Sequence, residues 1–183
     1  KKSQISSFHR PKNTAEYNLT PYLHKGENLV ALKIYRWSTG SYLECQDFWR
    51  LSGIERDVYV FAQPKVHLFD YRITPIVEHH AEDGLIGSGY FELDAVVKNN
   101  SKSNATVELS LGGALSGVEK RSVSIAAGEE SLQSFKIPFE GWNLWSAETP
   151  VLYDGSIALS QGGNVSEKVA FKFAPRKVEI IGN

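Results

Sequence analysis

The residues of this chain with the greatest capacity for chemistry lie within residues 36–58, RWSTGSYLECQDFWRLSGIERDV. Two carboxylic acids can act as the acid and the base or nucleophile of glycoside hydrolysis. An ionised carboxylate can also accept hydrogen bonds from hydroxyl groups, or bind a hard cation through oxygen. Aromatic rings can stack on a sugar ring. The stretch supplies both kinds of group, with carboxylates at Glu44, Asp47 and Glu55 and rings at Trp37, Tyr42, Phe48 and Trp49.

A structural interpretation of the same stretch is equally open on residue types alone. In that interpretation Asp47 pairs with Arg36 or Arg50, and Trp49 is buried in the core. Cys45 is the single cysteine of the chain, so no internal disulfide can form. We read Cys45 as a small loop residue, with a reactive thiol as the alternative.

Two other clusters also have a chemical and a structural interpretation. Residues 78–83, EHHAED, group two histidines with three carboxylates, as a metal site would. They precede an Asp-Gly turn, however, and adjacent histidines on a strand point to opposite faces, which favours an exposed hairpin tip. Trp142, Trp145 and Tyr153 form either a sugar-stacking platform or an aromatic plug between strands. We favour the plug, because aromatic rings are mostly core residues.

Composition narrows the class of protein. The chain has 183 residues, of which 42% are apolar, so a packed core is available. The net charge of −1 gives no electrostatic footprint for nucleic acid or a membrane surface, and neither is expected as a partner. No apolar run reaches the ~18 residues of a membrane span. Four Asn-x-Ser/Thr sequons, at Asn18, Asn99, Asn104 and Asn164, are read as coincidental.

Short strands are predicted in the first 62 residues. Residues 15–20, AEYNLT, alternate between apolar and polar, and Thr20 is expected to cap a single helical turn that begins at Pro21 and ends near Gly26. Residues 28–37, NLVALKIYRW, and residues 56–62, RDVYVFA, are expected to be strands. These strands are too few to close a sandwich, so the segment resembles the end of a larger β-domain.

Residues after 65 predict a different domain. Seven alternating strands follow at regular spacing, which is typical of an immunoglobulin-like sandwich. Asp83-Gly84 and Gly162-Gly163 are expected to form hairpin turns, and Pro75 places its strand at an edge or a bulge. The expected strands span residues 66–78, 89–99, 105–111, 117–127, 131–139, 151–160 and 165–173.

Three motifs resemble a known family. Residues 15–62, and above all RWSTGSYLECQDFWRLSGIERDVY, resemble the end of the sugar-binding jelly-roll domain of bacterial β-galactosidases of glycoside hydrolase family 2. LWSAETPVLY and FKFAPRKVEI resemble the last strands of the family's immunoglobulin-like second domain. The resemblance implies an all-β internal fragment, with the C-terminal part of the jelly roll at residues 1–63 and the sandwich at residues 64–183.

The resemblance also implies which residues act. The family's catalytic glutamates sit in a (β/α)₈ barrel that would follow, so no catalytic residue is expected in this segment, and Glu44 and Glu55 are not the catalytic pair. Asp47 matches the second aspartate of the family's EDQDxW motif, which contacts galactose and ligates sodium. Thr39 and Cys45 replace acidic residues, and the loss at Thr39 removes a ligand of a peripheral magnesium. We call residues 36–58 the arm, because the resemblance implies that they leave the jelly roll and complete a binding site built by another domain. The residues expected to pack the arm are Trp37, Phe48, Trp49 and Arg50.

The family's partners follow from the same resemblance. The parent enzyme is expected to bind a β-galactoside and to hydrolyse it by a retaining mechanism in its barrel domain. It is also expected to use sodium and magnesium. It should form a homo-oligomer in the bacterial cytoplasm or periplasm. The segment alone is expected to be inactive and to hold no metal. Two alternatives remain: a free-standing carbohydrate-binding module, and a fragment of a β-glucuronidase or β-mannosidase of the same family.

Overall fold

The computed structural model describes residues 16–37, 42–43, 53–54 and 56–178. The chain divides into two compact units, Lys1–Val60 and Phe61–Asn183. Within the part that the structure describes, no helix is long and apolar enough to span a membrane.

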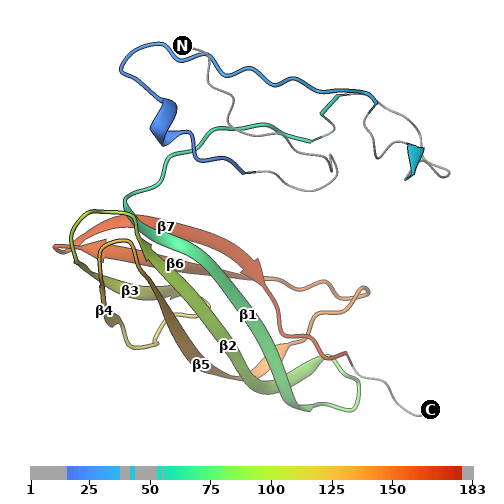
Figure 1. Ribbon diagram of the computed structural model, residues 1–183. Helices are drawn as coiled ribbons and strands as arrows, with labels where there is room; N and C mark the ends of the chain where they lie inside the picture. The colour runs from blue at the N-terminus through green and yellow to red at the C-terminus, as the bar shows by residue number, and fades with distance from the viewer. Residues whose placement is uncertain (1–15, 38–41, 44–52, 55, 179–183) are drawn as a thin grey trace. The chain divides into compact units, whose positions relative to one another are not determined.

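The second unit is a sandwich of two antiparallel sheets that lie face to face (Figure 1). One sheet has the order β1-β2-β5, with β1 at Val66–His80, β2 at Ile86–Asn99 and β5 at Glu130–Asn143. The other has the order β4-β3-β6-β7. Its strands are β4 at Arg121–Ile125, β3 at Ala105–Gly113, β6 at Tyr153–Gln161 and β7 at Asn164–Phe173. The predicted all-β class and the seven predicted strands are confirmed.

Alternation along the strands builds the core between the sheets. Phe91, Leu93, Ala95 and Val97 on β2 are at most 1% exposed, as the sequence pattern predicts. Side chains from the other sheet cover them, and burial of apolar surface at roughly 25 cal/mol per Å² is the main force that holds such a sandwich together. The buried residues of that sheet include Val107, Leu109, Val123, Ile157 and Leu159.

The predicted turns and the edge proline are also confirmed. Gly84 has φ +69°, and Gly162 and Gly163 have φ +58° and +82°. Residues other than glycine rarely adopt these backbone angles. Pro75 lies on β1, at the edge of its sheet, where its missing N–H does not interrupt a ladder. β4 is shorter than predicted because residues 114–117 form turns before it, and Gly117 adopts φ +95°.

Asn99 ties two turns of the sandwich together and is fully buried. Its Nδ2 donates to the carbonyl oxygens of Ser103, Ile125 and Ala126 at 2.9–3.1 Å, and its Oδ1 accepts from the N–H of Ser101 at 2.9 Å. The side chain therefore satisfies the backbone at both ends of the connection that contains β3 and β4. A sequon reading gives no hint of this role.

The strand predictions for the first unit are wrong for the residues that the structure describes. Residues 28–37 and 56–62 carry no strand, although Val30, Leu32 and Ile34 alternate as the sequence indicates and are 46–58% exposed. A strand requires a neighbour to accept and donate its ladder hydrogen bonds. The alternating pattern indicates that these residues are suited to a sheet. No strand forms because the described residues of this unit supply no partner strand.

The predicted helical turn is confirmed, with a correction to its cap. A 3₁₀ turn spans Thr20–Tyr22 with Pro21 near its start. Leu19, rather than Thr20, occupies the N-cap position, and the Asn18 Oδ1 accepts a 3.0 Å hydrogen bond from the Thr20 N–H. The turn ends at Tyr22, with Leu23 already extended, so the prediction that it ends near Gly26 is wrong, although Gly26 does adopt the expected positive φ of +98°.

Candidate functional site

Most of the predicted arm falls outside the described residues. Asp47, the residue expected to contact sugar and sodium, is among them. The predictions for these positions therefore remain predictions. They concern Thr39, Glu44, Cys45, Asp47, Phe48, Trp49, Arg50 and Glu55.

The ring at the described start of the arm lies at the surface. Trp37 is 50% exposed, and the guanidinium carbon of Arg36 lies 5.7 Å from its ring centroid. That distance suits a cation–π contact. Two residues earlier, the Lys33 Nζ lies 4.8 Å from the Tyr35 ring centroid, and the hydrogen bond with Tyr35 raises the pKa of Lys33. Residues 33–37 thus place two cationic side chains over exposed aromatic rings.

Tyr42 is the second predicted ring that the structure describes. It is 87% exposed, and the adjacent Leu43 is 85% exposed. Neither Trp37 nor Tyr42 is a core residue of the first unit. Tyr42 therefore lies at the surface of the first unit, and Trp37 is half exposed there.

The histidine and carboxylate cluster at residues 78–83 is an exposed hairpin tip, as favoured from the sequence. Glu78, His79 and His80 are all exposed at the end of β1, and the His80 Nδ1 lies 3.0 Å from the Ala81 carbonyl oxygen. Among the described residues, no group of three or more His, Cys, Asp and Glu side chains could hold a metal ion. The structure therefore does not bring a set of metal ligands together at this cluster.

The aromatic cluster near Pro150 is a plug between strands. The Trp142 ring centroid lies 4.4 Å from that of Tyr153 and 5.6 Å from that of Phe91. The Asn143 N–H donates a 3.0 Å hydrogen bond to the Tyr153 hydroxyl, which fixes the ring. These two rings are occupied by packing, so they form part of the core rather than a sugar platform.

Trp145 holds the end of the described chain. Its backbone N–H donates a 2.8 Å hydrogen bond to the Pro175 carbonyl oxygen, and the Arg176 guanidinium carbon lies 6.0 Å from its ring centroid. Pro175 is itself fully buried. The segment after β7 is thus fastened to the loop between β5 and β6.

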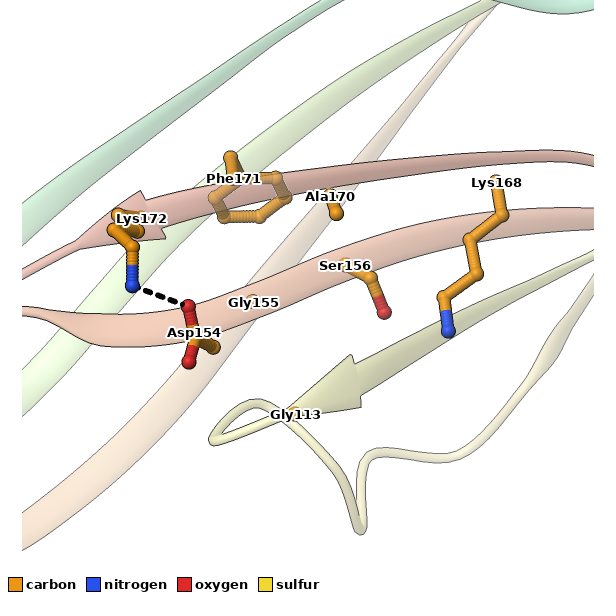
Figure 2. Close-up of a pocket in the computed structure, with 8 residues that line it drawn as sticks. All are labelled: Gly113, Asp154, Gly155, Ser156, Lys168, Ala170, Phe171 and Lys172. Carbon is orange, nitrogen blue, oxygen red and sulfur yellow. Dashed lines mark hydrogen bonds and ion pairs between the residues drawn. The ribbon is translucent and has the colours of Figure 1, made fainter.

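A hollow of about 560 Å³ on the sandwich was not predicted from the sequence. It lies on the outer face of the β3-β6-β7 sheet and is built largely from small residues. Figure 2 shows Ser156, Lys168 and Asp154 projecting from the same side of β6 and β7, while Phe171 projects from the other. The Lys172 Nζ donates to the Asp154 Oδ1 at 2.8 Å. The lining residues are Gly113, Asp154, Gly155, Ser156, Lys168, Ala170, Phe171 and Lys172.

The small residues on the outward face of β6 are the feature of the sequence that could have predicted this hollow. Ser156, Ala158 and Ser160 occupy successive outward positions of β6, where strands usually carry long polar side chains. The hollow could be predicted only if the pairing of the strands were known, because that pairing places Gly112 and Ala170 beside Ser156.

Comparison with protein families gives two matches that cover almost the whole chain. Residues 66–176 match the sequence profile described as "Glycosyl hydrolases family 2". Residues 2–64 match the one described as "Glycosyl hydrolases family 2, sugar binding domain".

Curated relatives include β-galactosidases from several bacteria. The chain is 35% identical over 178 residues to the β-galactosidase of Priestia megaterium, with 91% of this chain and 16% of the relative covered. It is 32% identical over 170 residues to that of Halalkalibacterium halodurans, with 92% and 16% covered. The chain thus spans 16% of the length of these relatives.

Solved structures with the same fold come from glycosidases with other names. The exo-chitosanase of Amycolatopsis orientalis superposes with a TM-score of 0.55 at 23% identity, over 67% of this chain and 14% of that one. A β-glucuronidase of Bacteroides uniformis gives 0.57 at 24%, over 70% and 16%. A β-galacturonidase of Eisenbergiella tayi gives 0.53 at 19%, over 64% and 20%. These likenesses establish the fold alone.

Proposed function

Because this chain belongs to glycosyl hydrolases family 2, we propose that it is part of a longer β-galactosidase that removes terminal β-D-galactose with retention of configuration. One observation carries the choice of galactoside: relatives named β-galactosidase align with 91–92% of the chain at 32–35% identity. The sandwich serves as scaffold in this proposal. The catalytic carboxylates lie in another part of the parent.

Residues 36–58 act in this proposal as an arm that completes a binding site built by another domain. Asp47 accepts hydrogen bonds from galactose hydroxyls, and Trp37, Phe48, Trp49 and Arg50 support it. The exposure of Trp37 and Tyr42 supports the proposal, because rings that pack against a second domain lie at the surface of their own. Such a contact can stabilise the transition state as well as bound substrate.

The donor chemistry of the arm fits sodium better than magnesium. Asp47 offers carboxylate oxygens, which are hard ligands, and would hold sodium together with groups from elsewhere in the parent. A bound sodium ion would orient sugar hydroxyls. Thr39 offers a neutral hydroxyl and Cys45 a soft thiol where the family has acidic residues, so neither position supplies the carboxylate that magnesium prefers. No role for magnesium is derived at these two positions.

The runner-up function is hydrolysis of a different β-glycoside, such as a β-glucuronide or a β-mannoside. The glucuronidase and galacturonidase among the solved structures motivate it, although their likeness is one of fold. A carboxylate-bearing sugar would be repelled by a carboxylate at Asp47, unlike neutral galactose. Asp47 therefore favours a neutral sugar.

The test is a substrate comparison with the full-length parent. Hydrolysis of nitrophenyl β-D-galactoside, β-D-glucuronide and β-D-mannoside is measured at equal enzyme concentration. The proposal predicts that kcat/KM for the galactoside exceeds the other two by at least about 100-fold, which corresponds to roughly 2.7 kcal/mol of transition-state discrimination. A preference for either of the other sugars would overturn it.

A further inference from the structure

The sequence contains two Asp-Gly pairs, Asp83-Gly84 and Asp154-Gly155, which the fold places in opposite settings. An aspartate followed by glycine can rearrange without an enzyme, because glycine has no side chain to hinder attack of its amide nitrogen on the aspartate side chain. The product is isoaspartate, in which the backbone runs through the side-chain methylene carbon. In a folded protein, the reaction requires that the backbone of the pair can move.

Asp83-Gly84 lies in the turn between β1 and β2, and both residues are exposed. Gly84 adopts φ +69°, and a Cβ built there would meet no atom within 4 Å beyond its chain neighbours. The space around the peptide bond between the two residues is therefore open. A loop tip of this kind opens locally at little cost in free energy.

The side chain of Asp83 is folded forward along the chain. Its Oδ1 accepts a 2.9 Å hydrogen bond from the Leu85 N–H, so the carboxyl group curls over the peptide bond to Gly84. The same hydrogen bond stabilises the charge that develops on this oxygen when the Gly84 nitrogen adds to the Cγ. The Gly84 N–H also donates a 2.9 Å hydrogen bond to the Ala81 carbonyl oxygen, which has to open first.

Asp154-Gly155 is the same pair held inside a sheet. Gly155 is buried on the interior strand β6, between Gly113 of β3 and Phe171 of β7. A Cβ at Gly155 would lie 2.7 Å from the Phe171 ring, so the backbone has no room to turn. The Lys172 Nζ lies 2.8 Å from the Asp154 Oδ1 and holds that carboxylate in place. Reaction at this pair requires β6 to leave the sheet.

We propose that Asp83 is a site of spontaneous isomerisation to isoaspartate, and that the sheet protects Asp154 from the same reaction. The Gly84 amide nitrogen forms a bond to the Asp83 Cγ, and the carboxyl hydroxyl leaves with the amide proton as water. The resulting succinimide takes up water at one of its two carbonyl carbons. Addition at the Cγ restores aspartate, and addition at the backbone carbonyl carbon gives isoaspartate. This chemistry requires nothing of the proposed function.

Isomerisation has a structural consequence because the turn is fastened to the rest of the sandwich. The Ala81 N–H donates to the Ile86 carbonyl oxygen at 2.8 Å, and the Leu144 N–H donates to the Leu85 carbonyl oxygen at 2.8 Å. Isoaspartate adds one carbon atom to the backbone between these contacts and so displaces Leu85 from Leu144. Leu144 is buried and precedes Trp145, whose N–H holds the segment after β7. Isomerisation should therefore loosen that segment as well.

The test is incubation of the folded 183-residue chain in water enriched in ¹⁸O at physiological temperature, followed by tryptic digestion in ordinary water. Asp83 lies in the peptide of residues 73–98 and Asp154 in that of residues 137–168, so mass spectrometry reads the two pairs separately. Isoaspartate that formed during the incubation carries ¹⁸O, and protein isoaspartyl methyltransferase marks its position. Isomerisation at Asp83 should be at least about 100-fold faster than at Asp154, because an interior strand opens far less often than a loop tip.

Unfolding supplies the control for intrinsic reactivity. In concentrated urea the sheet no longer protects Asp154, so the two pairs should react within about threefold of each other. Equal rates at the two pairs in the folded chain would refute protection by the sheet. An absence of product at Asp83 in the folded chain, while both pairs react in urea, would refute the site.

Asp83→Glu separates the chemistry from charge and folding. Its side chain is one carbon longer, so attack by the Gly84 nitrogen has to close a less favourable six-membered ring, and labelling at this position should disappear. The charge and the exposed setting are kept, so the fresh variant should have the Tm of the wild type. Asp154→Glu, the matched control at the protected pair, should leave the labelling of Asp83 unchanged.

Hydrogen exchange measures the structural consequence. The Leu144 N–H should exchange at least about tenfold faster in the chromatographically separated isoaspartate form than in fresh protein. The N–H of Leu93, in the core of β2, should be unchanged. Asp83→Glu incubated for the same time should match its fresh sample. Faster exchange of Leu144 in that variant, or unchanged exchange in the isoaspartate form, would refute the link between the turn and Leu144.

Discussion

Glu167 on β7 links the two sheets of the sandwich: its Oε2 accepts a 2.6 Å hydrogen bond from the backbone N–H of Leu68 on β1. β1 is the edge of its sheet, and its register shifts between Leu68 and Asp70. Outward N–H groups of an edge strand have no ladder partner and invite pairing with another chain. The half-buried carboxylate of Glu167 supplies that partner and closes the open side between β1 and β7.

Loss of this carboxylate should destabilise the sandwich. Glu167→Ala is expected to lower the free energy of unfolding by about 1–3 kcal/mol, since it removes a charged acceptor and leaves a backbone N–H unpaired. Glu167→Gln should have a smaller effect because its amide oxygen can still accept. Urea unfolding of the 183-residue chain measures both.

The control for Glu167 is another glutamate in an ion pair at the surface. Glu108 accepts from the Lys120 Nζ at 2.8 Å, with both side chains largely exposed. Glu108→Ala is expected to change stability by about 0–1 kcal/mol. If the two alanine variants were equally stable, the sheet-linking role of Glu167 would be refuted.

Asn99 should be among the least replaceable polar residues of the sandwich. Asn99→Ala leaves three carbonyl oxygens and one N–H without their partner, with an expected loss of about 3 kcal/mol. Asn99→Asp should be worse at neutral pH, because it places a buried charge beside carbonyl oxygens. Asn100→Ala, at an exposed neighbour, is the control, and thermal unfolding compares the three. A stable Asn99→Ala variant would contradict the account.

Asp94 gives the stability of the sandwich a pH dependence. The hydrogen bond from the Ser134 hydroxyl, followed by that from Arg72, lowers the pKa of Asp94 below its ordinary value of 3.8. A lowered pKa in the folded state means that the unfolded chain binds the proton more readily. The stabilisation is therefore present above the ordinary pKa and is lost as pH falls through the folded-state pKa.

The corresponding experiment compares wild type with Asp94→Asn by urea unfolding from pH 7 to pH 3. The difference in midpoint should be largest at neutral pH and should shrink below about pH 4, as the wild-type carboxyl takes up its proton. Ser134→Ala should reduce the difference, because it removes the hydrogen bond with the largest influence on the pKa. A difference that stays constant with pH would show that Asp94 acts only through its shape.

The isolated chain should not bind galactose. The plug rings Trp142 and Tyr153 are engaged in packing, and the proposed arm contacts sugar only when another domain completes the site. Titration calorimetry with galactose and lactose up to about 10 mM should give no heat above dilution. A measurable affinity would instead favour a free-standing carbohydrate-binding module.

The alternation of apolar and polar residues was sufficient to predict the strands of the second domain but not those of the first. The strand that carries Phe91, Leu93 and Ala95 follows a period of two, and burial of one face fixes that period. Val30, Leu32 and Ile34 show the same period, yet they form no strand, because hydrogen-bonding partners are a property of neighbours rather than of the segment. The boundaries of β4 depended on a turn that alternation does not encode.

Features that arise from register were beyond prediction. Ser156 is an ordinary strand serine in the sequence, and only its alignment with Gly112 and Ala170 makes it a mostly buried residue on the outer face of its sheet. Asn99 was taken for a coincidental sequon, because its four hydrogen bonds join residues up to 27 positions away. Asp47 was identified by its motif, and it lies outside the residues that the structure describes.

The most direct measurement of the central claim is the sodium dependence of galactoside hydrolysis by the parent carrying Asp47→Asn. The account predicts that kcat/KM falls by about 100-fold or more, a loss of roughly 2.7 kcal/mol, and that activation by sodium weakens. Asp57→Asn, at an exposed carboxylate of the same stretch, should retain wild-type kinetics. Wild-type turnover and unchanged sodium activation in Asp47→Asn would contradict the role of the arm.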